Sequence, residues 1–141
     1  MSQGYFRQGR PTIVEYLAGG LLGNVPLILV LFALSFSDPQ ILNTMLLTVQ
    51  VTIVASLAIG AAVAAFYVAV GVQSQHTFRV IVVGVVTGGF CYLINMALSL
   101  FLFPWLPLGD YVKILAFLPA GAIGAFVRTR KKRTIRRPPS S

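Results

Sequence analysis

A chain of 141 residues that is 57% hydrophobic and only 10% charged has too few charged side chains to cover the surface of a water-soluble domain, in which about 25% of residues are charged. Its formal net charge of +8 comes from 11 basic and 3 acidic residues, which lie at the chain ends and in short gaps between long apolar runs. This distribution favours an integral membrane protein and excludes a basic soluble protein that binds nucleic acid.

The chain begins with a polar segment and continues into four apolar runs. Residues 1–16 are expected to form a cytoplasmic N-terminal segment. A bilayer core about 30 Å thick requires roughly 20 apolar helical residues. The apolar runs therefore predict membrane spans at 17–36, 45–72, 80–103 and 111–127, which together make a transmembrane domain over residues 17–127.

The fourth run is the shortest, and a basic segment follows it. Lys113 lies near the start of this run, where we expect its apolar stem to let the amine reach the headgroups. Residues 128–141 contain RTRKKRTIRR and then PPSS, and we expect them to form an unfolded cytoplasmic tail.

Short gaps at 37–43, 72–79 and 104–110 separate the predicted spans. Loops this short make consecutive helices antiparallel neighbours, so the four spans form two hairpins. If the N-terminus is cytoplasmic, Lys113 is the single basic residue outside, as the positive-inside rule requires. The predicted fold is an all-α integral protein of the plasma membrane with four transmembrane helices, two antiparallel hairpins and both termini in the cytoplasm (N-in/C-in).

Every predicted span carries a patch of small residues. The patches are GGLLG at 19–23, the alanine-rich run at 60–69, the pair Gly84 and Gly88, and the stretch at 120–125. Small residues let helices approach closely in lipid, where apolar side chains alone give no preference for protein over solvent. The patches serve either packing within the chain or a homo-oligomer, and the sequence leaves both open.

Three uncharged polar residues lie inside the predicted spans, and two prolines interrupt them. Asn24, Gln50 and Asn95 are either interhelical hydrogen-bonding residues or the lining of a polar path for a ligand headgroup. Pro26 and Pro119 each free a backbone carbonyl one turn earlier, which adds acceptors to such a path.

The sequence contains no arrangement typical of an enzyme or a metal site. His76 is the only histidine, and no carboxylate lies deep in a span. A nucleophile, a general base or a set of metal ligands is therefore missing, and we expect a non-enzymatic protein without a cofactor or metal.

The basic cluster at the end of the fourth span is expected to bind anionic headgroups, at about 1 kcal/mol per residue. An acidic surface of a partner protein is the alternative. The basic cluster and one basic residue before the third span are the candidate contacts for a lipid phosphate: Arg79, Arg128, Arg130, Lys131, Lys132 and Arg133.

The two halves of the chain resemble each other. When Glu15 is placed on Arg79, EYLAGGLLGNVPLILVLFALS aligns with RVIVVGVVTGGFCYLINMALS without a gap, and Gly20 falls on Gly84. Each half contains two crossings, so the halves would be parallel repeats related by an axis along the membrane normal.

Residues 13–136 resemble the GtrA-like family of small four-helix membrane proteins. The likeness is carried by YLAGGLLGNV at 16–25, similar to the family's opening helix, and by AFVRTRKKRTI at 125–135, similar to its aromatic and basic exit. The chain departs from the family in having Pro26 where a polar residue is expected, and in lacking an Asn-Arg pair at the end of the second span. The resemblance implies the handling of polyprenyl-phosphate-linked sugars in cell-envelope glycosylation, either as a flippase or as an accessory of a membrane glycosyltransferase.

A structural or accessory subunit of a larger membrane complex is the alternative function, because that role needs no buried charge. A passive channel or holin-like pore ranks third, since no polar stripe is wide enough to hold water. The expected partners are anionic lipid headgroups and either a membrane glycosyltransferase, other membrane-protein subunits or a second copy of the chain.

Overall fold

The computed structural model describes residues 10–72, 76–101 and 110–135, except for the side chains of residues 42, 110 and 131–135. These residues form five helices and no strand: α1 (Ile13–Ser35), α2 (Pro39–Thr44), α3 (Leu46–Val70), α4 (Thr77–Phe101) and α5 (Asp110–Ile135). By length and composition, α1, α3, α4 and the stretch Tyr111–Arg130 of α5 could each cross a membrane. The expectation of an all-α chain with four such helices is confirmed.

The first two helices begin at side chains that cap them. Thr12 precedes α1 and forms a capping box with Glu15, in which each residue's side chain accepts a hydrogen bond from the other's backbone N–H. Asp38 caps α2 by accepting a hydrogen bond from the backbone N–H of Gln40, and Pro39 occupies the first helical position. Helix α1 thus begins at Ile13, inside the segment 1–16 that was expected to precede the first span. The short helix α2 occupies most of the predicted loop at 37–43.

The end of α5 differs from the sequence-based expectation. We expected an unfolded tail from residue 128, but α5 continues through the basic run to Ile135. Arginine and lysine have high helix propensity, and their positive charge at a helix C-terminus is stabilised by the helix dipole. Residues 1–9, 136–141 and most of the predicted loop at 104–110 lie outside the described residues.

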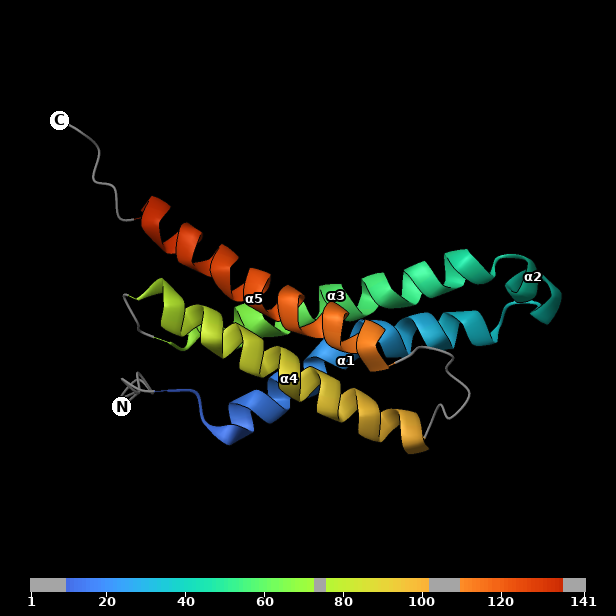
Figure 1. Ribbon diagram of the computed structural model, residues 1–141, viewed down its shortest axis with the longest axis horizontal. Helices are drawn as coiled ribbons and strands as arrows, with labels where there is room; N and C mark the ends of the chain where they lie inside the picture. Colours follow the sequence, from blue (N-terminus) through green and yellow to red (C-terminus); the bar gives the residue numbers. More distant parts are fainter. Residues whose placement is uncertain (1–9, 73–75, 102–109, 136–141) are drawn as a thin grey trace, which may run out of the picture.

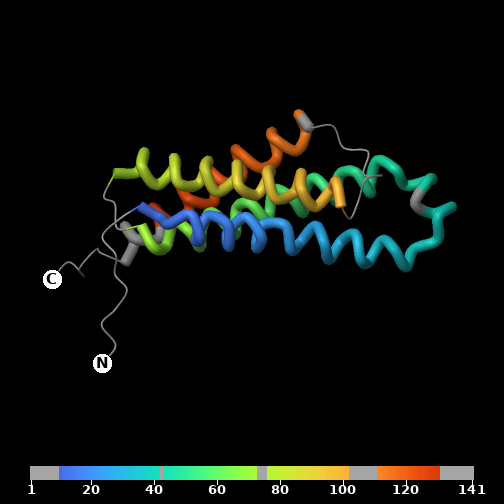
Figure 2. Tube along the Cα trace, turned by 90° about the horizontal axis from the view of Figure 1, so that it is seen from below, coloured from blue at the N-terminus to red at the C-terminus, as the bar shows by residue number. Residues whose placement is uncertain are grey.

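The four long helices lie side by side along one axis, and successive ones run in alternating directions (Figure 1). The start of α1 and the end of α5 lie at one end, here named the terminal end; α2, the end of α4 and the start of α5 lie at the other, the loop end (Figures 1 and 2). Helix α3 contacts each of the other three long helices, whereas α1 and α5 make at most a marginal contact.

Glycines allow the helix backbones to approach closely in both halves. A Cβ atom on Gly60 of α3 would overlap the carbonyl group of Gly23 on α1. A Cβ on Gly84 of α4 would likewise overlap the carbonyl oxygen of Gly121 on α5. The predicted small-residue patches therefore serve packing within the chain.

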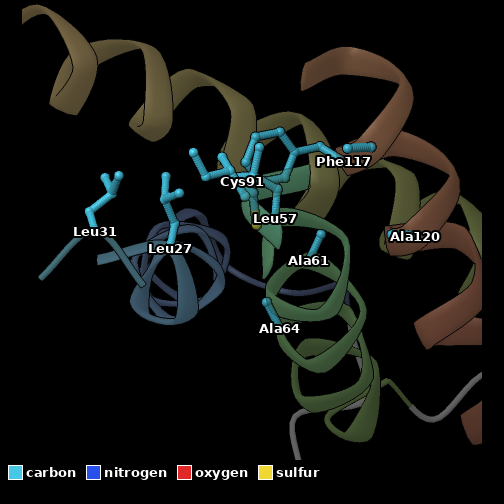
Figure 3. Packing of buried hydrophobic residues seen from close by; sticks show 10 residues of the cluster. Leu27, Leu31, Leu57, Ala61, Ala64, Cys91, Phe117 and Ala120 are labelled. Carbon is cyan, nitrogen blue, oxygen red and sulfur yellow. The ribbon is translucent and has the colours of Figure 1, made fainter. Parts of the chain in front are cut away.

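The core between the helices contains few large side chains. Leu57 of α3, Cys91 of α4 and Phe117 of α5 meet at its centre, with Leu27 of α1 beside them (Figure 3). The outward faces of all four long helices carry exposed leucine, isoleucine, valine or phenylalanine side chains. An apolar surface of this kind suits a lipid environment.

The burial pattern repeats between the two halves. When Gly20 is paired with Gly84 and Gly60 with Ala120, every buried residue from Gly19 to Leu31 of α1, and from Ile53 to Ala65 of α3, falls on a buried residue of α4 or α5. The buried residues recur at three- and four-residue spacing, as they do on one face of a helix. The α1–α4 alignment is the one that the sequence suggested.

Candidate functional site

Asn24 lies at the midpoint of α1 and is completely buried. Its side-chain amide donates hydrogen bonds to the carbonyl oxygens of Gly20, at 2.8 Å, and Cys91, at 3.0 Å. Its Oδ1 accepts a hydrogen bond of 2.9 Å from Nδ2 of Asn95 on α4. Two of the predicted intramembrane polar residues are therefore hydrogen-bonded to each other, and Asn24 takes part in two hydrogen bonds that join α1 to α4.

The polar contacts continue from Asn95 toward the loop end. The Ser99 hydroxyl donates to the Asn95 carbonyl oxygen at 2.8 Å, and the Lys113 amine on α5 donates to Ser99 Oγ at 3.5 Å. Asn24, Asn95, Ser99 and Lys113 are here named the polar cluster. It links α1, α4 and α5 and extends from the centre of α1 to the first turn of α5.

Two members of the polar cluster have unused hydrogen-bonding capacity. Asn95 is only 1% exposed, and within the described part of the chain its Oδ1 has no hydrogen-bond partner. Lys113 is 6% exposed, and its single hydrogen bond to a described residue is at the long limit for such a bond. A lysine ammonium has three donors. The cluster can therefore both accept and donate further hydrogen bonds.

The position of Lys113 differs from the sequence-based expectation. We expected its amine to reach the headgroups from the membrane edge, but the side chain is buried against α4. An ionisable group therefore lies inside the helical bundle, where none was expected. The sequence carried no clear signal for it, because Lys113 falls on Ile53 only when the buried residues of α5 are aligned with those of α3.

The other polar cluster residues can be compared with the opposite half in the same way. Asn24 of α1 falls on Gly88 of α4, and Asn95 of α4 falls on Leu31 of α1. The two halves thus share their burial pattern but differ in polarity at these positions. The packing of this helix face does not by itself require an amide or an amine there.

Arg128 is the second buried cation, at the terminal end of α5, with 7% of its surface exposed. Its guanidinium donates to the carbonyl oxygens of Val70, at 2.6 Å, and Val72, at 3.0 Å. The last carbonyls of a helix have no intrahelical partner, and a cation there is stabilised by the helix dipole. Arg128 therefore caps the C-terminal end of α3, a role that the sequence analysis did not foresee.

The other predicted headgroup contacts are located differently. Arg79 is exposed in the first turn of α4, and Arg130 is exposed with its guanidinium 5.1 Å from the centre of the Phe126 ring. Lys131, Lys132 and Arg133 belong to α5, but their side chains lie outside the described part of the structure.

The remaining predicted residues lie apart from the polar cluster's hydrogen bonds. Gln50 is half-buried on α3. Pro26 is half-buried and Pro119 is exposed, and both lie inside helices that continue on either side of them. Each proline lacks the N–H that would bond the carbonyl one turn earlier, which leaves an acceptor at that point.

An apolar groove of about 440 Å³ lies between α4 and α5. Its lining runs from Val86 to Leu93 on α4 and includes Ile114 and Leu118 on α5. A Cβ on Gly89 would meet no atom within 4 Å, so this glycine leaves open space in the groove. Ile114 directly follows Lys113 and Tyr92 lies one turn before Asn95, so the groove and the polar cluster share helices α4 and α5, although no residue of the cluster lines the groove.

Among the described residues, no group of three or more histidine, cysteine or acidic side chains could hold a metal ion.

The polar cluster suits binding of a polar, anionic group, and the apolar groove on the same helices suits an apolar chain. No protein-family model, curated protein or solved structure matches this chain.

Proposed function

We propose that this chain is a GtrA-like integral protein of the plasma membrane that binds polyprenyl-phosphate-linked sugars, and either translocates them or presents them to a membrane glycosyltransferase. The observation that carries the proposal is the buried polar cluster, which includes residues of α4 and α5, the two helices that also line the apolar groove. A lipid-linked sugar has a polar, charged head and a long apolar chain, and these two features need adjacent sites of matching polarity.

The proposed topology has two antiparallel hairpins, α1 with α3 and α4 with α5, and both termini in the cytoplasm. The alternating helix directions and the basic residues at the terminal end support it (Figure 1). A tag fused after Ser141 is expected to resist protease added to intact cells and to be digested after the cells are opened. Digestion in intact cells would contradict the topology.

The cytoplasmic phosphate contacts in this proposal are Arg79 and Arg130. Both are exposed at the terminal end, where a guanidinium can contact two phosphate oxygens at once. Arg128 is not assigned to this site, because its guanidinium is buried and hydrogen-bonded to the end of α3.

The test uses full-length protein in detergent micelles and a polyprenyl-phosphate-linked sugar as the probe. Arg79→Gln combined with Arg130→Gln is expected to weaken binding at least about tenfold, because each lost bond to a charged group contributes about 1.5 kcal/mol or more. Arg10→Gln, which removes an exposed arginine that precedes α1, is the matched control. Equal binding by wild type and the double variant would refute these contacts.

An accessory subunit of a larger membrane complex is the second candidate. The open space at Gly89 favours it, because a small residue on an outward helix face lets another helix approach. Co-purification in mild detergent distinguishes the two functions. A fixed set of membrane subunits that persists in Gly89→Leu would exclude this groove as their binding surface.

A further inference from the structure

We propose that Lys113, together with Ser99 and Asn95, forms a binding site for a phosphate group at the loop end of the bundle. This site lies at the opposite end of α5 from the arginines discussed above. Lys113 and Arg128 are about 22 Å apart along the helix axis, at about 1.5 Å per residue. The inference deepens the proposed function but rests on it only for the identity of the attached lipid chain.

The proposed site has unused hydrogen-bonding capacity. The Lys113 amine is buried and has one long hydrogen bond, to Ser99 Oγ, among the described residues. A buried ammonium without an anionic partner is unfavourable, because its charge has left water without compensation. A phosphate oxygen would supply the missing acceptor, and Oδ1 of Asn95 would accept a hydrogen bond from a hydroxyl on the same ligand.

The internal repeat also supports the site. Ile53 occupies the position of Lys113 in the other half, and Leu31 occupies the position of Asn95. Both apolar residues are buried there. The helical bundle therefore accommodates aliphatic side chains at these positions, and packing alone does not account for the lysine and the asparagine.

The apolar groove on the same two helices also supports the site. Ile114 and Leu118 line it on α5, directly beside Lys113 in the sequence and one turn further on. A phosphate bound at Lys113 could thus carry an apolar chain that lies in the groove. This geometry favours a lipid phosphate over a soluble one, and a cation at each end of α5 favours translocation over presentation at one face.

The experiment measures binding of two probes to the full-length protein in detergent micelles by native mass spectrometry: a polyprenyl phosphate and inorganic phosphate. Lys113→Met removes the charge but keeps a flexible apolar side chain at a position whose repeat partner is Ile53. We expect Lys113→Met to weaken phosphate binding at least about tenfold, because the lost contact is a hydrogen bond to a charged group. Arg10→Met, which removes the charge of an exposed arginine preceding α1, is the matched control and should bind both probes as the wild type does.

Each outcome decides the inference. Lipid binding that is lost in Lys113→Met and is not displaced by inorganic phosphate identifies a lipid phosphate as the ligand. If the wild type binds inorganic phosphate and Lys113→Met does not, the phosphate site is supported. If that wild type nevertheless fails to bind the polyprenyl phosphate, the proposed function is refuted but the phosphate site is not. Unchanged binding in Lys113→Met, or no binding of either probe to the wild type, overturns the inference.

A structural role for Lys113 is tested in the same samples. If the amine serves only to hold α5 against Ser99 near the end of α4, Lys113→Met should lower the unfolding midpoint. The phosphate site instead predicts an equal or higher midpoint for the variant without ligand, together with loss of the stabilisation that the polyprenyl phosphate gives to the wild type. A lower midpoint with retained ligand stabilisation would refute the site.

Discussion

Replacing the two buried asparagines singly and together tests the hydrogen bonds that join α1 to α4. Asn24→Leu removes two interhelical bonds, one to the Cys91 carbonyl and one from Asn95. Such bonds contribute on average about 0.6 kcal/mol each within a membrane, and up to about 1.7 kcal/mol. The change also leaves the Asn95 Nδ2 buried without its partner, which costs about 1–3 kcal/mol. We expect Asn24→Leu to lower the free energy of unfolding by about 2–4 kcal/mol.

Asn95→Leu is expected to cost less, about 1 kcal/mol. It removes one interhelical bond and leaves Asn24 Oδ1 without its partner, but it also removes the unpartnered Oδ1 of Asn95, which offsets that second cost. The double variant has neither amide, so no buried amide is left without its partner. We expect it to be less destabilised than the sum of the single variants by about 2 kcal/mol, since residues in one hydrogen-bonding network are energetically coupled.

Steric trapping in dodecylmaltoside micelles measures these free energies under conditions that favour the folded state. Thr87→Val is the matched control, because Thr87 is equally buried but its hydroxyl bonds only within α4, to the Val83 carbonyl oxygen. We expect this control to change the free energy by less than about 1 kcal/mol. Additive costs for the two asparagines, or an Asn24→Leu variant as stable as the control, would refute the bonded pair.

Three further substitutions test packing and capping by the same unfolding measurement. Gly60→Ala should destabilise the bundle by about 1–3 kcal/mol, because the new Cβ overlaps the α1 backbone, whereas Gly89→Ala enters open space and should be neutral; equal effects would contradict this packing. Arg128→Gln should cost about 2 kcal/mol, since it removes the charged cap of α3, and the exposed Arg130 serves as the matched control for its charge; equal losses in Arg128→Gln and Arg130→Gln would argue against the cap. Thr12→Ala should cost about 1 kcal/mol by removing the cap of α1, and no change would exclude the capping box.

The basic segment shows why an element boundary was predicted less well than the element. Apolar runs identified the fourth helix, but its end was placed at residue 127 because the charges that follow cannot lie in lipid. A helix does not have to end where the lipid ends, and α5 continues through good helix formers to Ile135. Composition reports the environment of a segment, whereas backbone hydrogen bonding decides how far the helix extends.

Lys113 and Arg128 show which features of the candidate site the sequence predicts and which only the structure decides. Their residue types and approximate depth could be read from the chain, as could the presence of Asn24 and Asn95 in apolar runs. The partners could not, because Ser99, the end of α3 and the facing asparagine come from other helices. Their contacts depend on helix rotation and on how closely the glycines let the backbones approach.

The sequence by itself determined that the chain has four long apolar helices and that the first and third of them align, since both properties follow from hydrophobic runs along one chain. Only the tertiary structure decided which charged and polar side chains are turned inward, because that choice depends on the packing of helices that are distant in sequence. Lys113 is therefore buried with its amine near the Ser99 hydroxyl of α4, although its sequence neighbours alone would have placed it at the membrane surface.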